Sequence, residues 1–284
     1  MKLQLVRHLW GVDQTCSLED YWPRWQAVGY EALEVSLRFV PDRAAFLKFL
    51  KQHQLGWIPQ AFTRDFAPGG SVRQHLDSLA EQVKECLDFQ PLFFNVHSGS
   101  DVWSLAEAED FYGAALELER QTGAAISHET HRLRCFGNPW TTKVILERFP
   151  SLKLTCDFSH WVCVAERLLE DCGETIQLAA QHCHHLHARV GYEEGPQVPD
   201  PRAPEWSRHL AAHEDWWNRI WAAQEKRGLK TSFLTSEFGP APYLHTLPFT
   251  QAPVADLADI CDWMARRQAN RFAARNAPVG QKRK

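Results

Sequence analysis

AAISHETHRLRCFGNPWTTKVILERFPSLKLTCDFSHW, residues 124–161, contains one complete strand–helix–strand unit. Ala124–His128 and Leu152–Cys156 are short apolar runs that end in polar residues, which is typical of buried strands. Between them, the apolar residues of Trp140–Phe149 recur at intervals of three and four, which predicts a helix with one face on a sheet. Two strands joined by a helix run parallel, because a parallel connection needs a crossover. This unit therefore predicts an α/β fold.

The same alternation extends over nearly the whole chain. Six further runs have strand character: Leu3–Arg7, Ala32–Leu37, Gly56–Phe62, Leu92–His97, His184–Val190 and Ser232–Glu237. Further helices are expected at Ser71–Phe89, Leu105–Thr122, Ala203–Arg227 and Val254–Arg275. The polar residues near the eight strand ends lie 26 to 35 residues apart, except for a last gap of 50. Eight such units in 284 residues predict a closed (β/α)8 TIM barrel.

An open, doubly wound sheet is the alternative to the barrel. Dinucleotide-binding sheets of that kind carry G-x-G-x-x-G after the first strand and bind their ligand where the strand order reverses. No such motif follows Leu3–Arg7, and polar residues follow nearly every strand. The barrel is therefore preferred. We expect one catalytic domain over residues 1–265, followed over 266–284 by a basic helix end and a partly disordered tail.

The composition excludes several classes of protein. With 44% hydrophobic and 23% charged residues the chain is globular, and its net charge of −4 does not provide the positive field that packages nucleic acid. No apolar run approaches the ~18 residues of a membrane span, and the N-terminal MKLQLVRHLWG lacks the features of a secretory leader. The eight cysteines include no C-x-x-C and are expected to be reduced. These features predict a soluble, cytoplasmic protein that acts on a small molecule, with self-association left open.

Polar residues at the strand ends are the candidates for a site, because barrel enzymes place their sites at the carboxyl ends of the strands. These residues are Arg7, His8, Glu34, Ser36, Gln60, Thr63, His97, Glu129, Asp157, His160, His185, His187 and Glu237. Carboxylates that converge on one axis would repel one another and take up protons. A divalent cation is the simplest group that lets them stay ionised.

Five segments resemble the strand ends of the xylose-isomerase-like TIM-barrel superfamily. They are NVHSGSD (95–101), SHETHR (127–132), CDFSHW (156–161), HLHARVGY (185–192) and TSEFGP (235–240). The superfamily includes sugar and sugar phosphate isomerases, ketose 3-epimerases, hydroxypyruvate isomerase, inosose dehydratase and the apurinic endonucleases. The resemblance follows the order and spacing of the motifs over nearly the whole chain. It implies a metal bound by Glu129, Asp157, His187 and Glu237. Such hard, oxygen-rich ligands suit Mn²⁺ best and also accept Mg²⁺, Co²⁺ or Zn²⁺.

The resemblance also implies a reaction. In the similar epimerases two glutamates bind the metal and exchange a proton with the carbon beside a carbonyl, which would make Glu129 and Glu237 the catalytic pair. The chain would then be a metal-dependent isomerase or epimerase of carbohydrate metabolism that forms an enediolate. Strand seven offers two histidines on one face, since the side-chain period is two. His187 matches the ligand position of the superfamily, and His185 would lie one layer below.

Six further residues are candidates for substrate binding: His8, Trp10, His97, His160, Arg189 and Glu193. His97 and His160 resemble residues of the superfamily that contact metal or substrate, and Arg189 shares a strand face with His187. Glu193 belongs to Gly191–Trp206, a stretch with four prolines that we expect to be an ordered lid over the barrel mouth.

Three alternatives to an isomerase are considered. Dehydration of a keto-polyol, as in inosose dehydratase, uses the same enolate chemistry. A phosphodiesterase on abasic DNA shares the fold, but its D-x-H after strand seven is missing here, where Asp200 is followed by Pro201 and Arg202, and the acidic balance opposes DNA binding. A barrel that only binds sugar is disfavoured because both expected proton-transfer glutamates are present.

Overall fold

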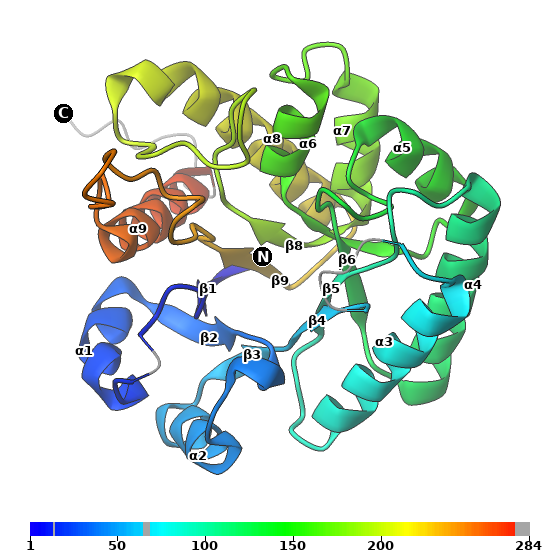
Figure 1. Cartoon of the computed structure of the whole chain (residues 1–284), viewed down its shortest axis with the longest axis horizontal. Coiled ribbons are helices and arrows are strands. Elements are labelled where there is room, and N and C mark those ends of the chain that lie inside the picture. The colour runs from blue at the N-terminus through cyan, green and yellow to red at the C-terminus, as the bar shows by residue number, and fades with distance from the viewer. Residues whose placement is uncertain (14, 65–68, 276–284) are drawn as a thin grey trace.

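Nine parallel strand segments form a ring at the centre of the molecule (Figure 1). The computed structural model describes residues 1–13, 15–64 and 69–275. The segments are β1 (Lys2–His8), β2 (Tyr30–Glu34), β3 (Gly56–Ile58), β4 (Gln60–Phe62), β5 (Phe94–His97), β6 (Ile126–Glu129), β7 (Lys153–Cys156), β8 (Cys183–His187) and β9 (Thr231–Thr235). Their order around the ring is β3-β2-β1-β9-β8-β7-β6-β5-β4, so strands that follow one another in the chain pair in space except β3 and β4, and β9 pairs with β1.

The ring closes because β3 and β4 are two parts of one extended segment, Gly56–Phe62, divided at Pro59. β3 pairs with β2, whereas β4 pairs with β5. Proline has no N–H to donate, so regular pairing is interrupted at this position, although the Pro59 carbonyl still accepts a hydrogen bond from Asn95 N (3.0 Å). The nine segments therefore occupy eight strand positions, and the predicted (β/α)8 TIM barrel is confirmed.

Nine α-helices within the described residues surround the strands (Figure 1). They are α1 (Leu18–Val28), α2 (Arg43–His53), α3 (Val72–Leu87), α4 (Leu105–Thr122), α5 (Pro139–Arg148), α6 (Phe158–Ala165), α7 (Gly173–His182), α8 (Ser207–Lys226) and α9 (Leu257–Arg275). Local sequence sets their ends: Ser71 and Ser104 form capping boxes at the starts of α3 and α4, and Gly123 ends α4 in the left-handed conformation. No helix in the described ranges is long and apolar enough to cross a bilayer.

The barrel interior is layered, because every second residue of each strand points inward. An apolar cluster fills the lower part of the barrel: Val6, Ala32, Ile58 and Phe93, packed against Ala125 and Phe233. Two residues further along the strands, the inward side chains become polar and remain buried, as at His8, Glu34, Gln60 and Asn95. The apolar layer closes the barrel from below, so a ligand has access from the carboxyl ends of the strands.

Helix α9 continues past residue 265, where the sequence predicts the barrel domain to end. Arg267 forms an ion pair with Glu214 (2.7 Å), and the buried Phe272 packs edge-on against Trp221, with ring centres 5.2 Å apart. The first part of the predicted basic end therefore packs on α8 as part of the helical layer. The rest of that stretch, 276–284, lies outside the described residues.

Candidate active site and metal centre

Four buried side chains meet at the carboxyl ends of β6 to β9. Each of Glu129, Asp157, His187 and Glu237 offers one ligand atom, and these atoms all lie within 4.8 Å of one another. Glu129 and His187 end their strands, and Glu237 follows β9 by two residues. Asp157 follows β7 and begins α6, where its Oδ1 accepts a hydrogen bond from Ser159 N (3.1 Å). The structure thus brings together the four residues that the sequence nominates as ligands.

The two glutamates of this cluster have pKa values that shift in opposite directions. Burial raises the pKa of Glu129, and the nearby charge of Glu237 adds to that rise. Burial opposes ionisation of Glu237 too, but Arg189 and His187 outweigh it and hold the pKa of Glu237 well below its usual range. Burial also raises the pKa of Asp157 to about 6, although Arg189 Nη2 lies 2.5 Å from its Oδ2. The cluster therefore contains one carboxylate that ionises easily and two that resist ionisation.

These residues fit a divalent cation. Glu129 Oε1 is buried and has no hydrogen-bond partner among the described residues, so one ligand oxygen is available. Three carboxylates and one imidazole form a hard donor set, which suits Mn²⁺ or Mg²⁺. Burying so many charges is costly unless positive charge accompanies them, and His187 and Arg189 supply part of it.

Glu34, at the end of β2, lies beneath the cluster and contacts the ring of His187. His187 Nε2 lies 3.1 Å from Glu34 Oε1, while Nδ1 lies 2.9 Å from Glu237 Oε2. Glu34 also accepts hydrogen bonds from Asn95 Nδ2 (2.8 Å) and Thr235 Oγ1 (2.7 Å). A carboxylate on one ring nitrogen commonly orients a histidine ligand through the other. Glu34, which the sequence analysis names only as a strand-end candidate, thus fixes the orientation of the His187 ring.

Opposite charges also shift the pKa values of His187 and Glu34, which face one another at the base of the cluster. Burial disfavours the charged form of His187, but Glu34, Glu237 and Glu129 raise its pKa well above the usual value. Burial likewise works against the charged form of Glu34, and His187 with His185 holds the pKa of Glu34 well below its usual range. His185 lies one layer beneath His187, with its Nε2 2.8 Å from Thr235 Oγ1, and burial lowers its pKa to about 3.

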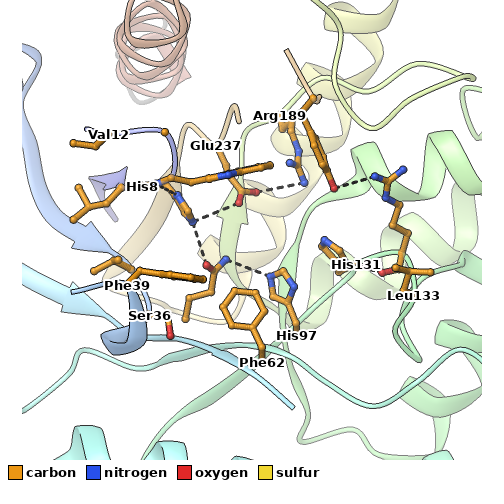
Figure 2. Close-up of a pocket in the computed structure, with 17 residues that line it drawn as sticks. His8, Val12, Ser36, Phe39, Phe62, His97, His131, Leu133, Arg189 and Glu237 are labelled. Carbon is orange, nitrogen blue, oxygen red and sulfur yellow. Dashed lines mark hydrogen bonds and ion pairs between the residues drawn. The ribbon is translucent and has the colours of Figure 1, made fainter. Parts of the chain in front are cut away.

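A cavity of about 540 Å³ opens above Glu237. A chain of polar side chains forms its floor (Figure 2): His8 Nε2 lies 3.5 Å from Glu237 Oε1 and 3.4 Å from Gln60 Oε1, and Gln60 Nε2 lies 3.2 Å from His97 Nε2. His8 Nδ1 accepts a hydrogen bond from the backbone N–H of Trp10 (2.8 Å), so Nε2 is the ring nitrogen that carries the proton and donates. A substrate on this floor would face hydrogen-bonding groups along its length.

Four of the six predicted substrate residues line the cavity: His8, Trp10, His97 and Arg189. His160 lies behind them, fully buried, with its Nε2 2.6 Å from Arg189 Nη2, and burial lowers its pKa well below the usual value. Glu193 is not brought to the lining and instead lies 2.8 Å from His209 Nε2 on α8. Its role in substrate binding stays a prediction, with no contact in the structure to support it.

The cavity also has lining residues that sequence reasoning missed, chiefly Phe39, Phe62 and Tyr243. Phe39 lies in a 3₁₀ turn at Leu37–Phe39, and Tyr243 lies in the loop that follows β9. Gln60 was noted only as a strand-end residue. No local motif marks these side chains. Phe39 and Tyr243 reach the cavity from irregular segments whose course depends on the folded barrel, and Phe62 is one of several apolar residues of a buried strand.

The predicted lid, Gly191–Trp206, is folded against the loop after β9. The buried side chain of Gln197 donates to Gly239 O (3.1 Å) and accepts from Gly239 N (2.7 Å). At the start of the segment, the backbone N–H of Gly191 donates a hydrogen bond to His213 Nε2 on α8 (3.2 Å). A Cβ on residue 239 would lie 2.2 Å from the ring of Trp10, so glycine is required for this close approach.

Comparisons with known proteins establish the fold. No protein-family model matches the chain, and no curated protein matches it in sequence. Among solved structures, a xylose isomerase-like TIM barrel protein from Mycobacterium smegmatis in complex with magnesium is similar with a TM-score of 0.64 at 10% identity, over 96% of this chain and 98% of the other. The probable 3-DHS dehydratase of Bacillus anthracis gives 0.58 at 15% identity, over 94% and 99%. The 3-keto-D-glucoside 4-epimerase of E. coli gives 0.57 at 10%, over 96% and 100%.

Proposed function

We propose that this chain, which has the xylose isomerase-like TIM-barrel fold, is a divalent-metal-dependent isomerase or epimerase of a small hydroxy-carbonyl compound. One observation carries the proposal: Glu129, Asp157, His187 and Glu237 converge within 4.8 Å directly beside a cavity of about 540 Å³ that Glu237 lines. Three carboxylates buried together are costly to maintain, and barrel enzymes use that end of the strands for chemistry.

The four residues of the cluster would hold the metal. When bound, a divalent ion, Mn²⁺ by first choice, supplies an electrophile that stabilises negative charge on neighbouring carbonyl and hydroxyl oxygens of a substrate. Glu34 holds Nε2 of His187 so that Nδ1 faces Glu237. Arg189, 3.4 Å from Glu237 Oε2 and in the cavity lining, is placed to orient a substrate oxygen beside Glu237.

Glu129 and Glu237 are suited to complementary roles in proton transfer. In the metal-free protein the surroundings move their pKa values apart, as is typical of a base and an acid that act at one pH. Glu237 lines the cavity and is the carboxylate that removes a proton from the carbon beside the carbonyl. Glu129 is the group that returns one. His97 lines the cavity and lies 2.9 Å from Glu129 Oε2, so it connects Glu129 with the space where substrate would lie.

Deuterium exchange tests the proposal. The protein is incubated with Mn²⁺ and a panel of ketoses and keto-glycosides in D₂O, and products are identified by NMR. We expect deuterium on the carbon beside the carbonyl, and at least ~100-fold less exchange by Glu129→Gln at saturating Mn²⁺. Glu174→Gln, which changes an exposed glutamate on α7, is the matched control and should exchange like the wild type.

Other outcomes identify other reactions. Loss of water after the exchange step would make the chain a dehydratase, which shares the first proton abstraction. Turnover without exchange would indicate a hydride shift in place of proton transfer. Cleavage of abasic DNA would contradict the proposal.

A further inference from the structure

The wall of the cavity on the side of β1 to β4 is apolar. It is formed by Leu9, Trp10, Val12, Val35, Phe39 and Phe62. In Figure 2, Val12 and Phe39 lie on one side of the cavity, whereas His131 and Arg189 lie on the other. The polar residues that this half contributes to the described lining are His8 and Gln60, which hydrogen bond along the floor, and Ser36, which lies next to Phe39 (Figure 2). A ligand above the floor would therefore meet aromatic and aliphatic surface on this side.

The aromatic wall is built by packing. The ring of Trp10 lies against Gly239 and meets Tyr243 edge-on, with ring centres 4.9 Å apart. Phe62 contacts Phe39 edge-on, with ring centres 6.3 Å apart. Phe39 is nevertheless 47% exposed at the rim, and exposed aromatic surface beside a cavity is characteristic of ligand-binding sites.

Cations that would bind a phosphate are scarce in the described lining. Arg189 is 1% exposed and is paired with Asp157 and Glu237. Arg132 donates to Tyr243 Oη (3.1 Å) and lies over the Tyr243 ring. Arg38 is outside the lining, with its guanidinium 4.7 Å from the centres of the Phe39 and Phe62 rings. The described lining thus offers a phosphate group little on the apolar side.

We propose that the substrate carries a flat apolar group beside its hydroxy-carbonyl head, as in an aryl-substituted hydroxy ketone. The head reaches Glu237, and the apolar group lies against Trp10, Phe39 and Phe62. The assignment of the head rests on the proposed function, whereas the assignment of the apolar group rests on the wall. A cavity of about 540 Å³ is in the range that holds a ligand with both parts.

Binding of a matched pair of ligands tests this inference without turnover. Methyl and phenyl β-glucoside lack a carbonyl, and their affinities for the Mn²⁺-loaded protein are measured by calorimetry together with that of glucose 6-phosphate. We expect phenyl glucoside to bind about tenfold more tightly than methyl glucoside, because a ring moves from water onto apolar surface. Phe39→Ala should weaken phenyl glucoside binding more than methyl glucoside binding. Phe249→Ala removes a fully exposed phenylalanine outside the lining and should leave the ratio unchanged.

The same preparation used for deuterium exchange separates the two proposals. A preference for phenyl glucoside without exchange of any ketose supports this inference and contradicts the proposed reaction. Exchange accompanied by equal affinities, by no measurable binding of either glycoside, or by tightest binding of glucose 6-phosphate overturns this inference and leaves the reaction standing. Loss of the phenyl preference in Phe249→Ala would also overturn it.

Discussion

The two halves of the barrel mouth come from different strands of one barrel and differ in chemistry. The half formed by the ends of β5 to β9 buries charged groups, among them Glu129, Asp157 and Glu237. The half formed by β1 to β4 presents an aromatic wall that includes Phe39 and Phe62. We call these the charged half and the apolar half. The charged half is costly to bury and depends on compensating charges, whereas the apolar half is stabilised by its own packing.

Under the proposed function, this difference assigns catalysis to the charged half and recognition of the ligand to the apolar half. Changes in the charged half should affect chemistry and folding strongly, because each carboxylate depends on neighbouring cations. Changes in the apolar half should affect the choice of ligand and leave the carboxylates in place. Glu34 is the exception that connects the halves, since it comes from β2 and holds His187 of β8.

The largest expected effect is on catalysis by the charged half. Glu237→Gln should reduce the rate of exchange by about 10²- to 10⁴-fold, because an amide cannot remove the proton. The rate is measured by deuterium incorporation at saturating Mn²⁺. Phe39→Ala in the apolar half should change the rate by less than about tenfold for a substrate without a ring. A similar loss in both variants would show that the halves do not act separately.

The next largest effect is on folding stability. Arg189→Met should lower the free energy of unfolding by about 3 kcal/mol in the absence of metal, because Asp157 and Glu237 lose their buried partner. Added Mn²⁺ should restore part of the loss, since a cation replaces the missing charge. Chemical denaturation with and without Mn²⁺ measures both. The control Arg219→Met, which breaks an exposed pair with Asp215, should change stability by less than about 1 kcal/mol.

Acid should weaken the contact between the predicted lid, Gly191–Trp206, and α8, where His213 Nε2 accepts a hydrogen bond from the backbone N–H of Gly191. Burial lowers the pKa of His213 to about 3 in the folded protein, whereas an unfolded histidine titrates near 6.5. The unfolded state therefore takes up the proton first as pH falls below about 6.5. The stability contribution is present above that pH and declines by about 1.4 kcal/mol per pH unit toward pH 3. Between pH 6.5 and 4.5, the slope of the unfolding free energy against pH should be smaller by that amount in His213→Gln than in the wild type. Equal slopes in the two proteins would contradict the assignment.

The smallest effect is on the stability of the apolar half. Phe39→Ala removes a side chain that is 47% exposed, so the free energy of unfolding should fall by less than about 1 kcal/mol. Thermal unfolding at fixed pH provides the measurement. A loss of several kcal/mol would mean that Phe39 is a structural residue and that its exposure serves no ligand.

Sequence periodicity predicted most of the fold, since β-like runs alternate with helical ones, and the predicted helices agree with the observed ones within four residues at each end. It did not predict the division of one strand at Pro59, because a proline at an inter-strand position becomes informative only once both neighbours are known. The barrel prediction nominated the polar strand ends as site candidates, whereas the resemblance to the superfamily singled out the four residues that converge in the cluster.

Contacts across the barrel were harder to predict from the sequence. Glu34 and His187 are 153 residues apart, and no local pattern shows that β2 and β8 project side chains toward one another. Tyr243 reaches the cavity through an irregular loop, so it carries no periodic signal. Glu193 was expected above a sugar because it lies in the proline-rich segment, but its carboxylate pairs with His209. Loop side chains depend on tertiary contacts, which residue type alone does not indicate.

Titration of metal-free protein with Mn²⁺, followed by electron paramagnetic resonance, tests the proposed metal centre most directly. Wild type and Phe39→Ala should each bind one ion per chain with similar affinity. Asp157→Asn and Glu237→Gln should bind it at least ~100-fold more weakly, because each replaces a charged ligand with a neutral amide. Undiminished affinity in both charged-half variants, or the absence of binding to the wild type, would contradict the assignment of the metal to this cluster.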